Sequence, residues 1–401
     1  MSLTLSRKAM QVKPSSTLAI TDKANQLRKA GVDVVGFGAG EPDFKTPDNI
    51  CAAAIDAINS GFTKYTAASG ILELKQAVCD KLERFNHLHY ETNQIVISNG
   101  GKHSLSNIFD AIINPGDEVL IPCPYWLSYP EMVKLSDGIP VFLTATKEND
   151  YKITASQLEK AITDKTKALV LNSPNNPTGM IYSEEELRAI ADVVVKKDIY
   201  VIADEMYEYL IYGDDRHVSI ASFNEEIYKR TITCSGMSKS YAMTGWRIGY
   251  AAAPTAQLAK LMSSIQSHAT SNPNSIAQRA ALEALNGPQE AVEEMKKEFG
   301  RRRDYMVETL RKMPYIDFSE PKGAFYVFID MTEALDLKYG GEKLDSISRL
   351  ADALLEDYAV AVVPCTDFGC PNHIRLSYAI SMEQIEKGLS RIAEFLGTLE
   401  A

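Results

Sequence analysis

The 401-residue chain has no long apolar run, and it contains only two tryptophans. A membrane-spanning helix needs about 18 or more consecutive apolar residues, so we expect no membrane partner. With 42 Lys and Arg against 53 Asp and Glu, the net charge of −11 argues against a nucleic-acid partner. The hydrophobic fraction of 45% excludes a disordered chain. The composition is therefore that of a large acidic enzyme.

Cysteine is scarce and shows no C-x-x-C pair, which favours free thiols in a reducing compartment. Cys365, Cys370 and His373 are close in sequence, but a zinc site normally needs a fourth ligand at finger-like spacing, so we expect no metal. The N-terminal residues lack the apolar core of a signal peptide. These features predict a cytoplasmic protein. The six cysteines are Cys51, Cys79, Cys123, Cys234, Cys365 and Cys370.

Short β-branched runs alternate with helical patterns between Asn93 and Ala252. One helical segment opens with Ser183 and Glu186, the pattern of a capping box. Apolar strands separated by helices predict an α/β fold with a mostly parallel central sheet that is covered on both faces. In such sheets ligands bind beyond the C-terminal ends of the strands. The expected strands are residues 94–98, 118–122, 168–172, 200–204 and 231–235.

The sequence pattern changes after about Pro288. A long charged helix is expected first, followed by strands and helices typical of a compact α+β domain. A chain of this length normally forms more than one core. We therefore predict a large domain over residues 46–287 and a smaller α+β domain over residues 288–401. Residues 1–45 are expected to pack on the small domain.

Polar and aromatic residues follow each expected strand, and Lys239 is the most informative of them. It lies in a Gly/Ser-rich turn that we expect to lead into a helix. A loop lysine taken alone is usually a solvated surface charge. A lysine desolvated at a sheet edge can instead form a Schiff base with an aldehyde cofactor. Arg247, the Ser238 hydroxyl and nearby backbone N–H groups would then hold a phosphate on that cofactor.

Residues 235–249, SGMSKSYAMTGWRIG, resemble the pyridoxal-phosphate attachment motif of the class I and II aminotransferases. The resemblance covers nearly the whole chain, in the family's motif order, and implies fold type I. Residues 12–20, VKPSSTLAI, and 38–44, GAGEPDF, resemble the bacterial aspartate aminotransferase subgroup. By this resemblance the cofactor is pyridoxal 5′-phosphate, attached to Lys239.

The resemblance also assigns roles around the cofactor ring. Asp204 corresponds to the carboxylate that pairs with the pyridine nitrogen and keeps it protonated. Tyr207 and Asn176 match the partners of the phenolic oxygen, and Trp126 matches the aromatic residue that stacks on the ring. Read without the resemblance, Asp204 would be a helix N-cap, Asn176 a turn residue and Tyr207 part of the core.

The phosphate and substrate contacts follow from the same resemblance. Backbone N–H groups of Gly101 and Lys102, at a helix start, would bind the phosphate together with Ser238 and Arg247. Tyr65 matches a tyrosine that reaches the phosphate of a neighbouring subunit, which implies a homodimer with shared active sites. Arg375, Asn176 and the Gly40 amide would bind the substrate's α-carboxylate, and Lys102 with Ser16 or Thr17 would bind a distal carboxylate. Trp126 would also contact the substrate.

These roles imply a ping-pong transamination that converts aspartate and 2-oxoglutarate into oxaloacetate and glutamate. Related enzymes with the same lysine and threonine also convert prephenate into arogenate, and that activity stays open. An aromatic or kynurenine aminotransferase and a C–S lyase of the same fold are alternatives, since a lyase shares Lys239, Asp204, Tyr207 and Arg375. A transcription regulator would need a helix-turn-helix segment that residues 1–45 are too short to supply.

Overall fold

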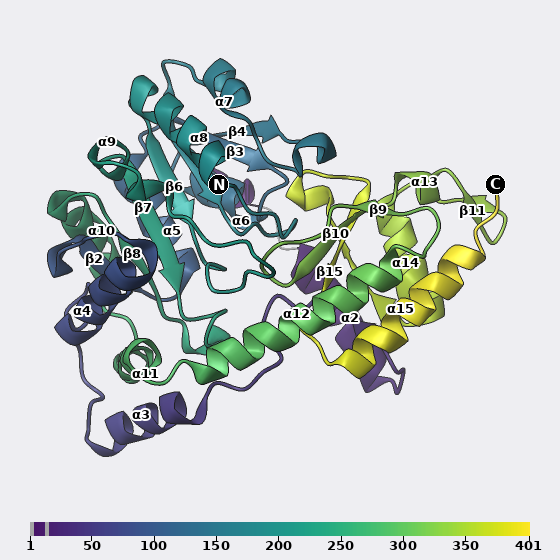
Figure 1. Ribbon diagram of the computed structural model, residues 1–401, viewed down its shortest axis with the longest axis horizontal. Helices are drawn as coiled ribbons and strands as arrows, with labels where there is room; N and C mark the ends of the chain where they lie inside the picture. The colour runs from purple at the N-terminus through teal and green to yellow at the C-terminus, as the bar shows by residue number, and fades with distance from the viewer. Residues whose placement is uncertain (1–3, 13–15) are drawn as a thin grey trace.

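Figure 1 shows a computed structural model of the protein, in which residues 4–12 and 16–401 are described. A seven-stranded sheet with the strand order β2-β8-β7-β6-β5-β3-β4 forms the centre of the larger part. Strand β8 is antiparallel to both its neighbours, and the other strand pairs are parallel. The strands are β2 (Ile95–Ser98), β3 (Glu118–Cys123), β4 (Ile139–Thr144), β5 (Thr166–Asn172), β6 (Tyr200–Asp204), β7 (Thr231–Gly236) and β8 (Gly249–Ala252).

Helices cover both faces of this sheet, because alternate strand residues point in opposite directions. Within β5, Val170 enters the core beneath α5, α6 and α10, whereas Leu169 and Leu171 enter the core beneath α7 and α8. The predicted mostly parallel α/β fold is therefore confirmed. The helices of this part are α3 (Asp48–Asn59), α4 (Leu72–Lys81), α5 (Gly101–Ile112), α6 (Ser128–Leu135), α7 (Ala155–Ala161), α8 (Glu184–Lys197), α9 (Glu225–Tyr228), α10 (Ala256–Ala269) and α11 (Ser275–Asn286).

The predicted capping box is present at the start of α8. The Ser183 N–H donates to Glu186 Oε2 at 2.7 Å, and the Glu186 N–H donates to Ser183 Oγ at 3.2 Å. One local prediction is wrong, because no α-helix follows Lys239. The chain turns instead through a short 3-10 helix (Thr244–Trp246) into β8. The helix is excluded there because β8 must return antiparallel between β2 and β7, over a buried run of Gly, Tyr and Ala.

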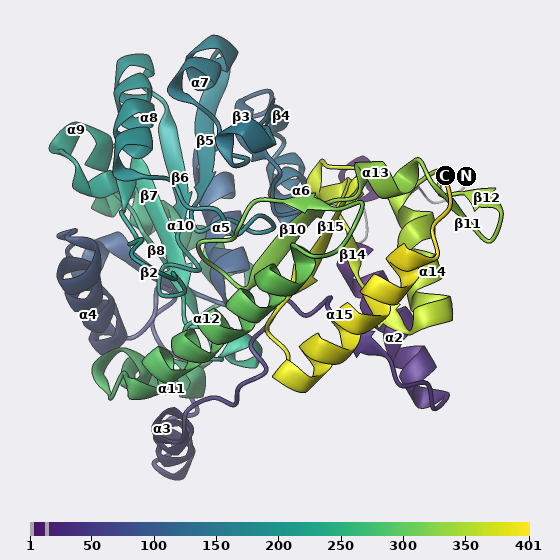
Figure 2. The same cartoon turned by 45° about the vertical axis from the view of Figure 1, so that its right-hand side comes forward.

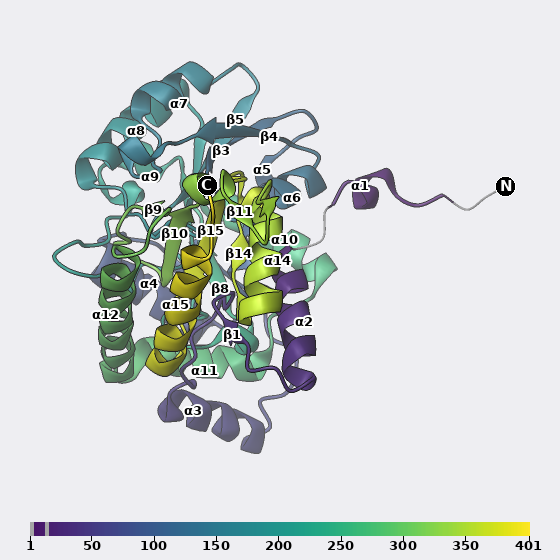
Figure 3. The same cartoon turned by 90° about the vertical axis from the view of Figure 1, so that its right-hand side faces the viewer.

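A second, antiparallel sheet with the order β14-β15-β10-β9 forms the centre of the C-terminal part. The long helix α12 is the charged helix expected after Pro288, and Figures 2 and 3 show it beside α15. The strands are β9 (Asp317–Phe318), β10 (Tyr326–Asp330), β14 (Val363–Pro364) and β15 (His373–Ser377), with a hairpin of β11 (Lys338–Tyr339) and β12 (Glu342–Lys343). The helices are α12 (Glu290–Leu310), α13 (Thr332–Leu335), α14 (Ile347–Tyr358) and α15 (Met382–Gly397).

The N-terminal segment contacts this C-terminal part. Strand β1 (Val35–Gly36) pairs in parallel with β13 (Val360–Ala361). Lys23 of α2 (Ser16–Lys29) lies 2.7 Å from Asp352 and 2.9 Å from Glu356, both on α14. The short α1 (Arg7–Met10) lies farther out, as Figure 3 shows. The boundaries of the three predicted domains stay a prediction. Over the described ranges, no helix has the length and apolar character needed to cross a membrane.

Candidate active site

A cavity of about 510 Å³ lies at the C-terminal edge of the central sheet. Its walls include residues that follow β2, β3, β5, β6 and β7, because these strands point the same way and end at one edge. Residues 38–41 and side chains of the C-terminal part close the other side. The predicted site residues that line the cavity are Gly40, Gly101, Lys102, Trp126, Asn176, Asp204, Tyr207, Ser238, Lys239, Arg247 and Arg375.

Two predicted site residues are not among the lining residues. Tyr65, on the segment between α3 and α4, is 89% exposed. Thr17, like Ser16, lies in the first turn of α2, and the side chains of both are outside the part of the chain that the structure describes. The predicted roles of Tyr65 and Thr17 therefore stay predictions.

Lys239 lies in the turn after β7, with its side chain in the cavity. Its Nζ donates a hydrogen bond to the carbonyl oxygen of Gly40. Burial lowers the pKa of this amine to about 8, an effect that Glu41 partly offsets and that the charges of Arg375 and Arg247 reinforce. A larger fraction of the amine is therefore uncharged, and so nucleophilic, near neutral pH than for an exposed lysine.

Asp204, the last residue of β6, places a buried carboxylate at the floor of the cavity. The Tyr129 hydroxyl donates to its Oδ2 at 2.6 Å, and the Met206 N–H donates to its Oδ1 at 3.2 Å. Burial nevertheless raises the pKa of Asp204 to about 6. No ion pair to this carboxylate is found within the described residues. The position thus suits a ligand with a cationic N–H group.

Tyr129 and Tyr326 were not singled out from the sequence, although both line the cavity. Tyr129 comes three residues after Trp126, and the two rings lie edge to face with their centroids 5.3 Å apart. This i, i+3 spacing is the sequence feature that could have indicated Tyr129 as a neighbour of Trp126. The Tyr326 hydroxyl lies 3.0 Å from the Tyr207 hydroxyl. That contact joins segments 119 residues apart, and no local pattern in the sequence indicates it.

The start of α5 forms one end of the cavity. Gly100, with a φ of +85°, precedes the helix, and a Cβ there would lie 2.4 Å from Nη2 of Arg247. The guanidinium group of Arg247 therefore lies directly over the turn, fixed by a 2.9 Å hydrogen bond from Nη1 to the Thr244 carbonyl. The first N–H groups of a helix have no intrahelical partner and favour an anion. This end of the cavity suits a phosphate group.

Arg375 of β15 is only 3% exposed and enters the cavity from the C-terminal part. Its Nη1 donates to Asn176 Oδ1 at 2.9 Å, and its guanidinium carbon lies 4.2 Å from the centre of the Tyr326 ring. Its buried Nε has no hydrogen-bond partner among the described residues. A carboxylate ligand would satisfy such a donor, because arginine can bind a carboxylate through two parallel hydrogen bonds.

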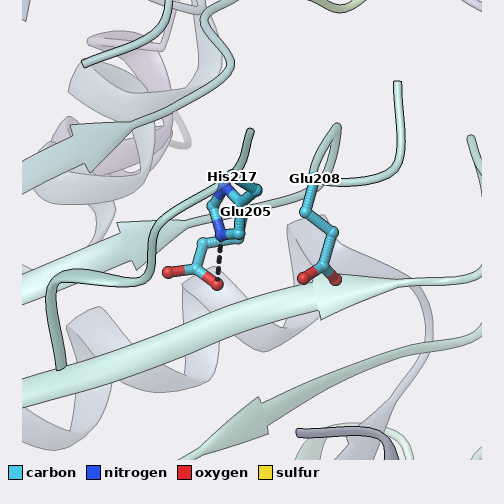
Figure 4. Close-up of side chains that lie close together, drawn as sticks. All are labelled: Glu205, Glu208 and His217. Atoms are coloured by element: carbon cyan, nitrogen blue, oxygen red, sulfur yellow. Dashed lines mark ion pairs between the residues drawn. The ribbon is translucent and has the colours of Figure 1, made fainter. Parts of the chain in front are cut away.

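A buried charged cluster lies next to this site, beyond the end of β6. Figure 4 shows Glu205, Glu208 and His217, with His217 Nε2 3.0 Å from Glu205 Oε2. Their ligand atoms are close enough to hold a metal ion. However, the ammonium group of Lys81 lies 2.5 Å from Glu208 Oε1, and Asn86 Nδ2 donates to both carboxylates. A cation of the chain itself thus already compensates these charges, and we describe the cluster as an ionic network.

The sequence cluster of Cys365, Cys370 and His373 has other contacts. His373 Nε2 lies 3.2 Å from the Tyr151 hydroxyl, and its ring stacks on Phe328 with centroids 4.5 Å apart. Cys365 is fully buried and its thiol donates to the Val363 carbonyl at 3.5 Å. These contacts give Cys365 and His373 roles in packing.

A mixed sheet with a buried lysine, and a helix start suited to a phosphate group at the same edge, is the arrangement of a pyridoxal-phosphate transferase of fold type I. The chain belongs to the class I and II aminotransferases, whose family model matches residues 32–392. It is 49% identical over 392 residues to the aspartate aminotransferase of Bacillus sp. (strain YM-2), which covers 98% of this chain and 99% of that protein. It is 48% identical over 397 residues to the aspartate/prephenate aminotransferase of Cereibacter sphaeroides, with coverages of 98% and 99%.

Solved structures give the same assignment of fold. The crystal structure of the aspartate aminotransferase from Rhizobium meliloti matches this chain with a TM-score of 0.96 and 40% identity, and each chain is covered completely. The Thermus thermophilus aspartate aminotransferase with maleate matches with a TM-score of 0.92 and 42% identity, covering 98% of this chain and 100% of that one. The predicted family and fold type are therefore confirmed.

Members of this family depend on pyridoxal 5′-phosphate, and their substrates are amino acids and keto acids. The cavity fits this cofactor at three separate points. Lys239 offers an amine for the aldehyde, the buried Asp204 carboxylate offers a partner for a protonated ring nitrogen, and the α5 start with Arg247 suits the phosphate.

Proposed function

We propose that this protein is an aspartate aminotransferase that converts aspartate and 2-oxoglutarate into oxaloacetate and glutamate by a ping-pong mechanism. The observation that carries the proposal is the meeting of Lys239, Asp204 and Arg375 in one cavity. Relatives at 46–49% identity that bear this name support it. The similar Thermus structure was solved with maleate, a dicarboxylate like aspartate.

Pyridoxal 5′-phosphate, when bound, supplies an aldehyde for covalent attachment and a ring that takes up electron density from the substrate Cα. Arg375 binds the α-carboxylate and so fixes the Cα–H bond for proton transfer. The Lys239 amine, when free and uncharged, acts as a general base that accepts the Cα proton at Nζ. It then acts as a general acid and donates that proton again. Asp204 would provide a negative charge for the ring nitrogen, and Asn176 and Tyr207 would provide hydrogen-bonding groups for the ring oxygen.

A variant of Lys239 tests this function directly. Lys239→Ala should lose transamination of aspartate, because both covalent attachment and proton transfer depend on this amine. Borohydride reduction followed by mass spectrometry should show covalently held cofactor in the wild type and in Lys297→Ala, an exposed lysine of α12, but not in Lys239→Ala. Normal turnover by the Lys239 variant would end the proposal.

We further propose that Lys102, with Ser16 or Thr17, binds the distal carboxylate of the substrate. Its Nζ lies 5.0 Å from the centre of the Trp126 ring, and burial together with the Arg247 charge lowers its pKa. Lys102→Ala should raise the KM for aspartate about tenfold or more, because one charged hydrogen bond is lost. The KM for phenylalanine, which has no distal carboxylate, should change little. Equal losses for both amino acids would refute its role in selectivity.

Prephenate is a second candidate amino acceptor, supported by relatives named aspartate/prephenate aminotransferase. It carries two carboxylates, so Arg375 and Lys102 would bind it as they bind aspartate. Steady-state assays with oxaloacetate, 2-oxoglutarate and prephenate on the same preparation would rank the acceptors. Formation of pyruvate and ammonia from a sulfur amino acid would favour the C–S lyase alternative instead.

We also propose that the protein forms a homodimer in which Tyr65 of each subunit completes the active site of the other. We propose the cytoplasm as its location. The exposed Tyr65 supports it, together with large apolar side chains exposed nearby in sequence. Ile55 and Ile58 of α3 are 56% and 53% exposed, and Leu72 of α4 is 64% exposed. Such side chains favour burial against another protein surface.

A further inference from the structure

Two cysteines that the catalytic proposal does not use lie close in sequence to residues that line the cavity. Cys123 is the last residue of β3, three residues before Trp126. Cys370 follows the short 3-10 helix that ends at Phe368, on the C-terminal part. Trp126 and Phe368 both line the cavity. Each cysteine is therefore two or three residues from a residue of the cavity wall, although neither is itself a lining residue.

The segment before Cys370 passes directly over the Cys123 side chain. The Cys123 thiol donates to the Gly369 carbonyl at 3.5 Å and to the Phe368 carbonyl at 3.8 Å. A Cβ on Gly369 would lie 2.3 Å from Cys123 Sγ. The Tyr125 N–H donates to the Phe368 carbonyl at 3.2 Å, which holds the same two segments together. The Cys370 and Cys123 thiols are close enough for each to shift the pKa of the other.

The two thiols differ in a way that suits oxidation. The nearby Cys370 thiol lowers the pKa of Cys123 against the opposing effect of burial, and the same contact raises the pKa of Cys370. Cys123 is buried, at 6% exposed, whereas Cys370 is half-buried, so Cys370 gives the pair its exposure to solvent. A thiol with a lowered pKa beside a second thiol is an arrangement in which oxidation can end in a disulfide.

We propose that Cys123 and Cys370 form a peroxide-sensitive pair whose disulfide fastens the Phe368 wall of the cavity to the Trp126 wall and slows turnover. The Cys123 thiolate attacks hydrogen peroxide, gaining one oxygen as a sulfenic acid while hydroxide leaves. Cys370 sulfur then attacks the Cys123 sulfur, the S–S bond forms, and the oxygen leaves with the Cys370 proton as water. Two thiols and one peroxide thus give one disulfide and two waters.

The disulfide slows turnover because it joins two segments that otherwise meet only through hydrogen bonds and packing. Phe368 also packs on Arg375, with the guanidinium carbon 5.4 Å from the ring centre. Motion of the Phe368 segment therefore changes the surroundings of the residue assigned to the substrate carboxylate. Loop movements of this kind often limit product release in enzymes. The slowed turnover rests on the proposed transamination, whereas formation of the disulfide does not.

The experiment treats the purified holoenzyme with a small excess of hydrogen peroxide and maps its cysteines by peptide mass spectrometry without reduction. We expect a peptide that joins Cys123 to Cys370, the loss of two hydrogen atoms from the intact mass, and a fall in kcat of about tenfold that dithiothreitol reverses. Cys370→Ser should keep its activity under peroxide, and Cys51→Ser, which alters the other half-buried cysteine, should respond as the wild type does.

Each alternative result overturns a defined part of the proposal. A disulfide between Cys365 and Cys370, or oxidation with no disulfide, would exclude the Cys123–Cys370 pair. If the Cys123–Cys370 disulfide forms and kcat stays unchanged, the proposed effect of the disulfide on turnover is excluded. Cys123→Ala provides a second variant without the pair, should Cys370→Ser fold poorly. If the joined peptide forms in a protein with no transaminase activity, the proposed function fails while the oxidisable pair stands.

Discussion

At the scale of single residues, Asp204 shows a conflict between stability and the proposed chemistry. Folding raises the pKa of its carboxyl from 3.8 to about 6. Between these pH values the folded protein binds more protons than the unfolded chain, so the stabilising contribution present below pH 3.8 is lost as the pH rises through 6. Above that window the charged carboxylate destabilises the fold by about 3 kcal/mol. A ligand cation at this position would offset the cost.

Asp204→Asn should therefore stabilise the cofactor-free protein relative to the wild type, by an amount that grows by about 3 kcal/mol between pH 4 and pH 7. Urea unfolding of both proteins at several pH values measures this difference. The same substitution should weaken cofactor binding, since an amide cannot pair with a protonated ring nitrogen. Asp56→Asn, at an exposed position of α3, should show neither effect. A pH-independent difference would mean that Asp204 titrates normally in the fold.

A site residue can be predicted from the sequence when its position follows from a local pattern, and not when it depends on packing between distant segments. Lys239, Asp204 and Asn176 lie at or just beyond the ends of apolar strands, so the parallel-sheet rule alone places them at one edge. Arg375 was assigned through the family motif. Tyr326 was missed because its contact with Tyr207 forms between two sheets, and such packing leaves no periodic signal in either segment.

At the scale of elements, the cavity depends on how closely β8 packs against the start of α5. A Cβ on Gly249 would lie 2.4 Å from the Gly101 nitrogen and 2.6 Å from the Gly100 carbonyl carbon. These are backbone atoms, which a side-chain rotation cannot relieve. The turn before α5, which we propose binds the phosphate, therefore keeps its position only if residue 249 has no side chain.

Gly249→Ala should accordingly push the start of α5 away from the sheet. We expect a loss of about 1–3 kcal/mol in unfolding free energy, the usual cost of overpacking, and weaker binding of pyridoxal 5′-phosphate. Thermal unfolding and cofactor titration measure the two effects. The matched control is Gly300→Ala in α12, where the added Cβ would meet Tyr212 Cδ1 at an ordinary 3.5 Å. Gains in helix propensity of about 0.5–1 kcal/mol are expected there. Equal stabilities of the two variants would contradict the close approach of β8.

The same strand shows why part of the fold could not be predicted. Strands β5 and β6 are apolar, β-branched runs, and the sequence indicated them directly. Strand β8 has the sequence GYAA, with no β-branched residue, and forms because it fits between β2 and β7. The wrong expectation of a helix after Lys239 has the same origin, because tertiary packing outweighs local propensity in this segment.

At the scale of the whole molecule, the cavity requires both halves of the chain. Arg375 and Phe368 come from the C-terminal part, and Lys239 and Asp204 from the central sheet. Residues 38–41 belong to the N-terminal segment that pairs with β13. Substrate binding can therefore depend on the relative position of these parts, which connects the Cys123–Cys370 contact with turnover.

The exposed Tyr65 leads to a test of whether a second subunit completes the site. Tyr65→Asp would impair the phosphate contact proposed in the partner's site, and Lys239→Ala would inactivate the subunit's own site. Each homodimer should be nearly inactive. A hybrid dimer, however, combines the intact Lys239 of one subunit with the intact Tyr65 of the other in a single site. Mixed dimers, separated by two affinity tags, should therefore recover about half of the wild-type kcat per dimer, because one of two equivalent sites is restored. If Tyr65 instead acted within its own subunit, no site in the hybrid would be intact, and the mixture would stay as inactive as its parents.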